Sequence, residues 1–294
     1  MKRSEGFFGL HFDFHAGADC NEIGKTFTEE MAREIIETLK PDFIQCDCKG
    51  HPGYSSYPTI AGNPAPGFVG DPLKIWRKVT SEYGVPLTMH YSGVFDRRAI
   101  ELHPEWAATG EDKTPNKEMT SVFKGYADGL LIPQLIELAN GYGVDAVWVD
   151  GECWASVPDF DEANVRAFEG EYKMKLKKDA DGKYEKDSTE YKSFLDYSRG
   201  LFKDYLTRYV DAVHAEAPQF EIASNWAYSS FMPVPVESGV NFLSGDFNSV
   251  DSYNAARLDA RVLCEQGMPW DLVAWGFFYT FQKNSTIATK GVPA

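Results

Sequence analysis

Hydrophobic positions along the chain follow two alternating patterns. Short, nearly continuous apolar runs are typical of strands, and longer segments with apolar residues every three or four positions are typical of helices. The run at 144–149, VDAVWV, is almost wholly apolar, as expected of a parallel strand covered on both faces. We predict seven strands, at 7–14, 43–48, 85–91, 144–149, 220–224, 241–244 and 272–277.

The segments between these runs carry start and stop signals of helices. Thr26 followed by Glu29 predicts a capping box for a helix that begins near Phe27. Asp71 precedes Pro72, which is favoured at the first position of a helix, and Gly143 is a typical helix end. Helices are therefore expected at about 27–39, 71–84, 126–142, 190–215 and 250–266.

Strands that alternate with helices imply a parallel sheet with right-handed crossovers. Seven such units in 294 residues favour a (β/α)8 TIM-type barrel over an open sheet. The chain ends where a seventh helix and an eighth strand should follow. Either the last βα unit is absent from this sequence, or the strand count is off by one.

We predict a single catalytic barrel domain over 1–294, with an insertion around 155–190 after strand four. The insertion contains the charged stretch KMKLKKDADGKYEKD, which predicts a solvated face with a helix and an exposed turn at Asp181 and Gly182.

The net charge of −15 argues against nucleic acid and against an anionic membrane as partners, because both require a basic surface. It favours a small neutral or cationic substrate, and it leaves the oligomeric state open. The opening MKRSEGFFGL lacks the apolar core of a signal peptide, and the five cysteines are odd in number and irregularly spaced. We therefore expect reduced thiols and a cytoplasmic protein, unless a signal peptide has been lost from the sequence. No cofactor is expected.

In barrels of this type the active site lies at the carboxyl ends of the strands. The residues expected there combine carboxylates, imidazoles and aromatic rings, which is the mixture that a glycosidase needs for acid–base chemistry, hydroxyl binding and stacking on a sugar. The candidate substrate-binding residues are His11, His15, Asp47, His51, His90, Tyr91, Glu152, Trp154, Trp226 and Trp275.

Asp150 is the sharpest catalytic candidate. It directly follows an apolar strand, where an ionisable group costs solvation energy unless it has partners or a function. The plainer interpretation is a carboxylate that caps the following turn, and Glu152 has a similar one as a surface or salt-bridged group. The second carboxyl group is Asp246, in LSGDF, or Glu237, in PVPVESG. We favour Asp246 slightly, because groups at strand ends are held more rigidly.

The segment LLIPQLIELANGYGVDAVWVDG (130–151) resembles the segment around the nucleophile in family 29 α-L-fucosidases. Shorter segments at 7–17, 46–59 and 84–96 resemble other parts of that family, in the same order along a barrel. The resemblance implies that Asp150 is the nucleophile and that His11 or His15 contacts sugar hydroxyls. Where the family carries a His-His-Asp-Gly run, this chain has only His51 as a counterpart. That departure indicates a divergent or neighbouring fucosidase family, and a galactose-like sugar stays an alternative substrate.

The expected function is hydrolysis of a terminal sugar with retention, with an α-L-fucoside as the leading substrate. Two alternatives stay open. His11, Asp13 and His15 share one strand face and, with Asp47 and His90, would suit zinc in a metal-dependent hydrolase on the same barrel. Strands five and six supply no histidine, so no metal is expected. The other alternative is a non-catalytic carbohydrate-binding barrel.

Overall fold

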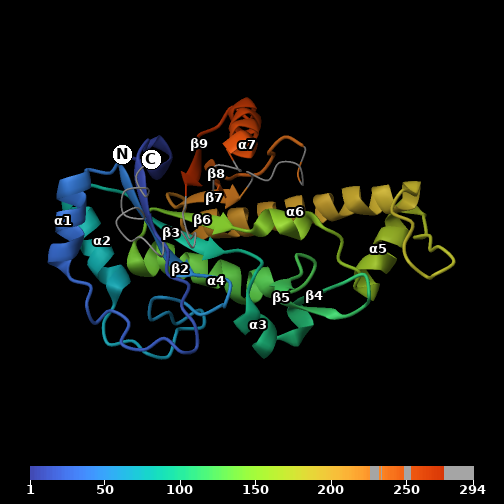
Figure 1. Cartoon of the computed structure of the whole chain (residues 1–294), viewed down its shortest axis with the longest axis horizontal. Helices are drawn as coiled ribbons and strands as arrows, with labels where there is room; N and C mark the ends of the chain where they lie inside the picture. Colours follow the sequence, from blue (N-terminus) through green and yellow to red (C-terminus); the bar gives the residue numbers. More distant parts are fainter. Residues whose placement is uncertain (226–231, 233, 248–252, 275–294) are drawn as a thin grey trace.

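The computed structural model describes residues 1–225, 232, 234–247 and 253–274. Its centre is a seven-stranded sheet in which every neighbouring pair is parallel, in the order β1-β2-β3-β6-β7-β8-β9 (Figure 1). The sheet curves into a nearly closed barrel of the (β/α)8 type that lacks one unit among the described residues, which confirms the predicted fold class. The strands are β1 Gly9–Phe12, β2 Phe43–Lys49, β3 Leu87–Ser92, β6 Ala146–Asp150, β7 Glu221–Asn225, β8 Phe242–Phe247 and β9 Trp270–Ala274.

The helices between the strands are α1 Glu29–Leu39, α2 Pro72–Tyr83, α6 Thr189–Glu216 and α7 Tyr253–Glu265. The side chain of Asp71 accepts a hydrogen bond from the backbone of Lys74, so α2 begins as predicted. The predicted cap of α1 was wrong by two residues. Thr28, not Thr26, accepts from the backbone of Met31, and this register places Glu29 and Glu30 in the first turn, where the helix dipole favours negative charge.

The predicted helix at 126–142 is present in three parts: the π-helix η3 Ala127–Leu131, α4 Ile132–Ile136 and the π-helix η4 Glu137–Tyr142. Pro133 has no backbone N–H and cannot donate within this helix, which is a local reason for irregular hydrogen bonding. Gly143 ends it in the left-handed conformation, at φ +67°, as predicted.

Several short elements were not predicted. The loop after β3 contains α3 Arg97–Leu102, the 3-10 helix η2 Pro104–Trp106 and the antiparallel pair β4 Ala107–Thr109 and β5 Pro115–Thr120. After β6 comes the 3-10 helix η5 Glu152–Ser156, which was also not predicted, whereas α5 Glu162–Tyr172 lies where a helix was expected within 155–190. In Figure 1, α5 lies beside the start of α6, at the far right. The single domain with an insertion after strand four stays a prediction.

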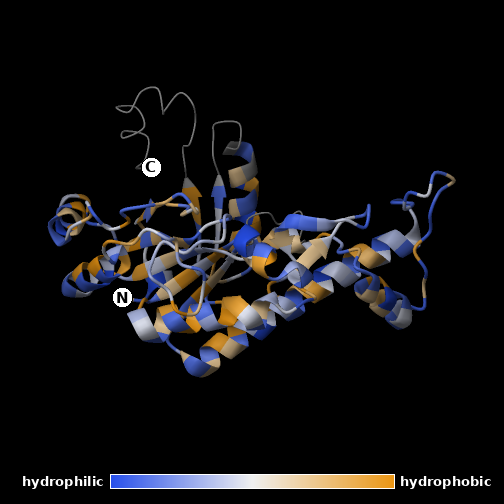
Figure 2. Ribbon diagram, turned by 90° about the horizontal axis from the view of Figure 1, so that it is seen from below, coloured by the Kyte–Doolittle hydropathy of each residue, from blue (hydrophilic) through white to orange (hydrophobic). Residues whose placement is uncertain are grey.

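Alternation along the strands separates two layers. Outward-facing residues form the main core with the helices, and Figure 2 shows the strands in mostly hydrophobic colours at the centre of the molecule. Inward-facing residues of β6, β7 and β8 form a smaller cluster inside the barrel: Ala146, Trp148, Ala223 and Phe242. Because side chains alternate, the inward positions near the carboxyl ends of the strands carry polar residues, and these build the site described below.

The amino ends of the strands are covered by the 3-10 helix η1, Arg3–Glu5. Arg3 is only 2% exposed; its guanidinium lies 3.3 Å from the ring centroid of Phe43 and 4.6 Å from that of Phe242, and it pairs with Asp271. The backbone N–H of Ser4 donates to the Glu221 carboxylate at 3.0 Å. The chain start thereby joins β2, β7, β8 and β9 at one end of the barrel. Within the described chain, none of the helices is both long enough and apolar enough to span a membrane.

Candidate active site

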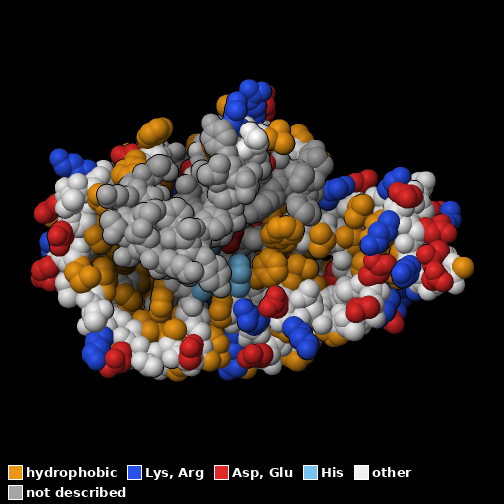
Figure 3. Space-filling view, viewed as in Figure 1, with side chains coloured by type: hydrophobic (Ala, Val, Ile, Leu, Met, Phe, Trp, Pro, Cys, Tyr) orange, Lys and Arg blue, Asp and Glu red, His pale blue; other side chains and the backbone are white. Residues whose placement is uncertain are grey.

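A cavity of about 540 Å³ opens at the carboxyl ends of the strands. This volume lies within the range of roughly 300–1,000 Å³ that is usual for small-molecule sites. In Figure 3, pale-blue histidine side chains are visible near the middle of the face, at the border of the grey atoms. The cavity is lined by His11, Asp13, Phe14, His15, His51, His90, Trp148, Asp150, Asp246 and Val273.

Asp150, the last residue of β6, lines this cavity and has a donor at each carboxylate oxygen. His90 Nε2 lies 3.2 Å from Oδ2, and the side-chain amide of Asn225, at the end of β7, donates to Oδ1. Burial alone would raise the pKa of this carboxyl, but the hydrogen bond and positive charge of His90 bring it below its ordinary value. Asp150 is therefore a fixed carboxylate that faces a cavity.

His90 lies between two carboxylates. Its Nδ1 is 2.6 Å from Oδ1 of Asp47, on the side opposite Asp150, and its side chain is only 5% exposed. Burial opposes a charge on the imidazole, but the hydrogen bonds with Asp150 and Asp47 raise its pKa to about 10. Both ring nitrogens therefore donate, and the ring orients Asp150.

Two further imidazoles face the cavity with opposite hydrogen-bonding roles. His11 Nδ1 lies 2.9 Å from the amide nitrogen of Gln45, so Nδ1 accepts and Nε2 carries the hydrogen. His51 Nδ1 lies 2.6 Å from Oγ of Ser92, whose own hydrogen is donated to the Phe95 carbonyl. His51 therefore donates through Nδ1 and keeps Nε2 as an acceptor. Burial lowers the pKa of both imidazoles to about 4, which keeps them neutral.

The structure does not bring every predicted residue to the cavity. Tyr91 is fully buried on the outer face of β3, and its hydroxyl donates to Gln134 at 2.9 Å. Strand alternation is the reason, because Tyr91 follows the inward-facing His90 and must point the other way. Trp154 lies in η5 and is 36% exposed, but it is not among the residues that line the cavity. Trp226 and Trp275 lie outside the described residues.

Glu152 is also absent from the cavity lining. Its fully buried carboxyl is bonded to the hydroxyl of Tyr209 on α6, at 2.8 Å from Oε2. Burial raises its pKa to about 8. The turn at Gly151, with φ +70°, redirects the chain between the two acidic residues, so Asp150 and Glu152 do not share a strand face.

The two candidates for the second carboxyl group lie in different places. Asp246, on β8, lines the same cavity as Asp150. Glu237 is 65% exposed and pairs with Lys203, and this hydrogen bond holds its pKa below the ordinary value. A general acid needs the opposite shift, so the surroundings of Glu237 do not suit that role.

Sequence reasoning left Trp148 and Gln45 out of the predicted site. Trp148 lines the cavity, with its ring centroid 5.0 Å from that of His90, and Gln45 orients His11. A signal was present, because Trp148 precedes Asp150 by two positions and Gln45 precedes Asp47 by two, which places each pair on one strand face.

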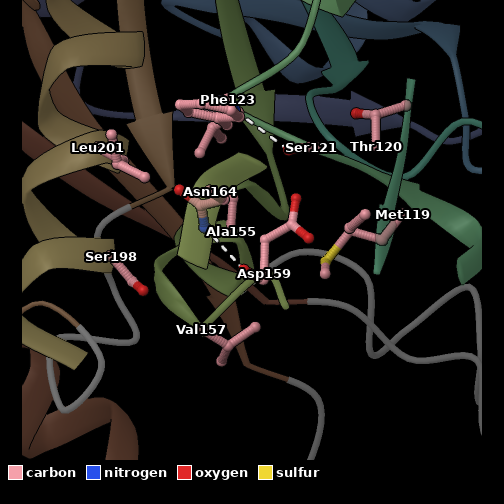
Figure 4. Close-up of a pocket in the computed structure, with 12 residues that line it drawn as sticks. Met119, Thr120, Ser121, Phe123, Ala155, Val157, Asp159, Asn164, Ser198 and Leu201 are labelled. Carbon is pink, nitrogen blue, oxygen red and sulfur yellow. Dashed lines mark hydrogen bonds between the residues drawn. The ribbon is translucent and has the colours of Figure 1, made fainter. Parts of the chain in front are cut away.

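A second cavity, between β5, η5 and α6, is far too small for a substrate. Its volume is about 10 Å³, roughly the room for one water molecule. Figure 4 shows Asp159, Asn164 and Phe123 around it, with the side-chain amide of Asn164 bonded to the backbone of Asp159. The larger cavity is therefore the candidate active site.

No family model and no curated protein matches the sequence. Solved structures do match its fold. An α-L-fucosidase, isoenzyme 2 from Paenibacillus thiaminolyticus, is 19% identical with a TM-score of 0.72, over 96% of this chain and 42% of its own. A β-N-acetylhexosaminidase from Bacteroides fragilis is 11% identical with a TM-score of 0.53, over 94% of this chain and 51% of its own. The chain thus spans about half or less of these proteins and shares the fold of their matched parts.

Proposed function

We propose that this chain is the catalytic barrel of a retaining glycoside hydrolase that removes a terminal sugar, with Asp150 as its nucleophile. The observation that carries the proposal is the placement of Asp150: a carboxylate at the end of a buried strand, held by two donors, in the wall of a cavity of about 540 Å³. The two similar folds belong to proteins named as glycoside hydrolases, which supports the same class of reaction.

In this mechanism Asp150 attacks the anomeric carbon and forms a covalent glycosyl-enzyme. His90 and Asn225 fix the rotation of its carboxylate, so one oxygen stays directed at the sugar. Asp246 protonates the leaving oxygen in the first step and then removes a proton from the water that releases the sugar. Its place in the wall of the same cavity supports this assignment over Glu237.

The remaining lining favours a polar, uncharged ligand. His11 offers a donor and His51 an acceptor, a pair that suits sugar hydroxyls. The rings of Trp148 and Phe14 supply apolar surface. Among the described residues, no lysine or arginine lines the cavity, whereas Asp13, Asp150 and Asp246 do. An acidic sugar would be repelled there, and an α-L-fucoside, which the sequence resemblance favours, is neutral.

The test is a panel of aryl glycosides, with α-L-fucoside and β-D-galactoside among them, assayed with the wild type, Asp150→Ala and a surface control. Asp196→Asn is a suitable control, because Asp196 is exposed on α6 and pairs with Arg199, three positions further along the same helix. We expect turnover of the α-L-fucoside by the wild type and the control, and NMR should show the first product with the anomeric configuration of the substrate. Full turnover by Asp150→Ala would end this mechanism, and sugar binding without turnover of any glycoside would favour a carbohydrate-binding barrel.

A further inference from the structure

We infer that Asp13, His15, Asp47 and His90 form a binding site for one divalent transition-metal ion of the Zn²⁺ class, in the wall of the sugar cavity. The four ligand atoms, one from each residue, all lie within 4.8 Å of one another. His90 would present Nδ1, because its Nε2 is directed at Asp150, and Nδ1 would release its proton to solvent as the metal binds. His15 presents Nε2, which is 3.1 Å from Oδ1 of Asp13. Two imidazole nitrogens and two carboxylates make a complete tetrahedral donor set for zinc.

A second observation at Asp47 points to a cation. Its Oδ2 atom is buried and has no hydrogen-bond partner within the described part of the chain. A buried carboxylate oxygen without a partner is costly, and a bound cation would satisfy it. Lys49, the nearest amine along the chain, is directed elsewhere, since its Nζ lies 2.9 Å from Asp96 and 3.2 Å from the hydroxyl of Tyr126.

The surroundings already hold one ligand in place. His90 contacts Asp150 through the nitrogen that would not bind the metal, and metal-bound histidines commonly have such an outer carboxylate, which fixes the ring. The rings of His90 and His15 are nearly parallel, with an interplanar angle of 5° and centroids 5.7 Å apart. Half of the donors are imidazoles, so the site should prefer Zn²⁺ to Mg²⁺ or Ca²⁺, which bind through oxygen.

The sequence argued against a metal because strands five and six supply no histidine. The structure assembles the four donors from β2, β3 and the segment after β1 instead. Asp13, His15 and His90 line the cavity, so the bound ion would face it. Because four protein ligands leave no open position on a tetrahedral ion, the metal would, in addition to the proposed function, hold the segment after β1 against β2 and β3 and so shape this wall of the cavity.

The test is zinc binding by the whole chain after treatment with chelator, measured by equilibrium dialysis with elemental analysis and by the visible absorption of bound Co²⁺. We expect one ion per chain and Zn²⁺ favoured over Mg²⁺. Asp47→Asn and His15→Ala each remove a direct ligand. Each should weaken binding by more than the roughly 10–100-fold that follows loss of an outer partner.

Two matched controls should leave the affinity unchanged. His103→Ala removes an exposed histidine that pairs with Glu105, and Cys264→Ser removes an exposed thiol that could bind zinc adventitiously. Circular dichroism checks the folding of each variant, and the exposed His15 keeps the test possible if Asp47→Asn does not fold. Absence of stoichiometric zinc, or equal affinity in His15→Ala and the wild type, would overturn the site. Turnover of glycosides measured on the same samples separates this outcome from failure of the proposed function.

Discussion

The two ends of the barrel both bury charged side chains, but they surround them differently. At the amino ends of the strands, Arg3 stacks on Phe43 and Phe242 and pairs with Asp271, so its charge is met within the protein. At the carboxyl ends, Asp150 and His90 face a cavity of about 540 Å³. We therefore expect the buried charges at the amino ends of the strands to stabilise the fold, and those at the carboxyl ends to bind or react with a ligand. The predictions that follow test this division.

The largest effect is expected at Asp150. Asp150→Asn keeps the shape of the side chain but removes the nucleophilic carboxylate, so kcat should fall by about 10³-fold or more on the best aryl glycoside. The midpoint of urea unfolding should change little by comparison. Steady-state kinetics and urea titration of the same preparation measure both. A large loss of stability without loss of kcat would place Asp150 among the structural charges instead.

The next effect separates the two candidates for the acid. Asp246→Asn should lower kcat by roughly 10²–10⁴-fold on substrates with poor leaving groups, because general acid catalysis is lost, and by less on activated aryl glycosides. Glu237→Gln should leave kcat unchanged, since Glu237 is exposed and paired with Lys203. If kcat instead fell in Glu237→Gln on substrates with poor leaving groups and stayed unchanged in Asp246→Asn, Glu237 would be the general acid.

At the other end of the barrel, Arg3→Ala should lower the free energy of unfolding by about 3 kcal/mol, because it removes the cation paired with Asp271 and the stacking on two rings, and leaves the Asp271 carboxylate with the hydrogen bond from Ser244. The kcat of the folded fraction should stay the same. Arg3→Lys keeps the charge but not the planar guanidinium, so its free energy of unfolding should lie between those of the wild type and Arg3→Ala. An Arg3→Ala variant as stable as the wild type would show that this contact does not hold the barrel ends together.

The smallest effect is a dependence of stability on pH at Glu152. The pKa of about 8 in the folded state is above the ordinary value of 4.5, so between these two pH values the folded state binds a proton that the unfolded state has released. The stability of the wild type should therefore fall as pH rises from about 4.5 to about 8. Glu152→Gln should remove this part of the slope, so its free energy of unfolding should change less than that of the wild type between pH 5 and pH 8.5. Urea unfolding at pH 5, 7 and 8.5 measures the free energy of unfolding of both proteins. The same dependence on pH in the wild type and in Glu152→Gln would contradict the prediction.

Much of the barrel could be predicted because its signals are local. The apolar runs identified all seven strands, and Asp71 with Pro72 identified the start of α2. Local signals failed where two of them competed, as at the cap of α1, where Thr26 and Thr28 both fit. They also failed where no periodicity existed, as in the β4–β5 pair, which depends on contact between two short segments.

The candidate site could also be predicted from the sequence only in part. By itself the sequence determined which residue types end each strand, because strand periodicity and apolar burial are properties of neighbouring positions. Only the tertiary structure decided that His90 lies between Asp47 and Asp150, and that Glu237 points to Lys203 at the surface. These relations join residues dozens of positions apart, and they exist only once barrel curvature and parallel register have brought the strand ends together.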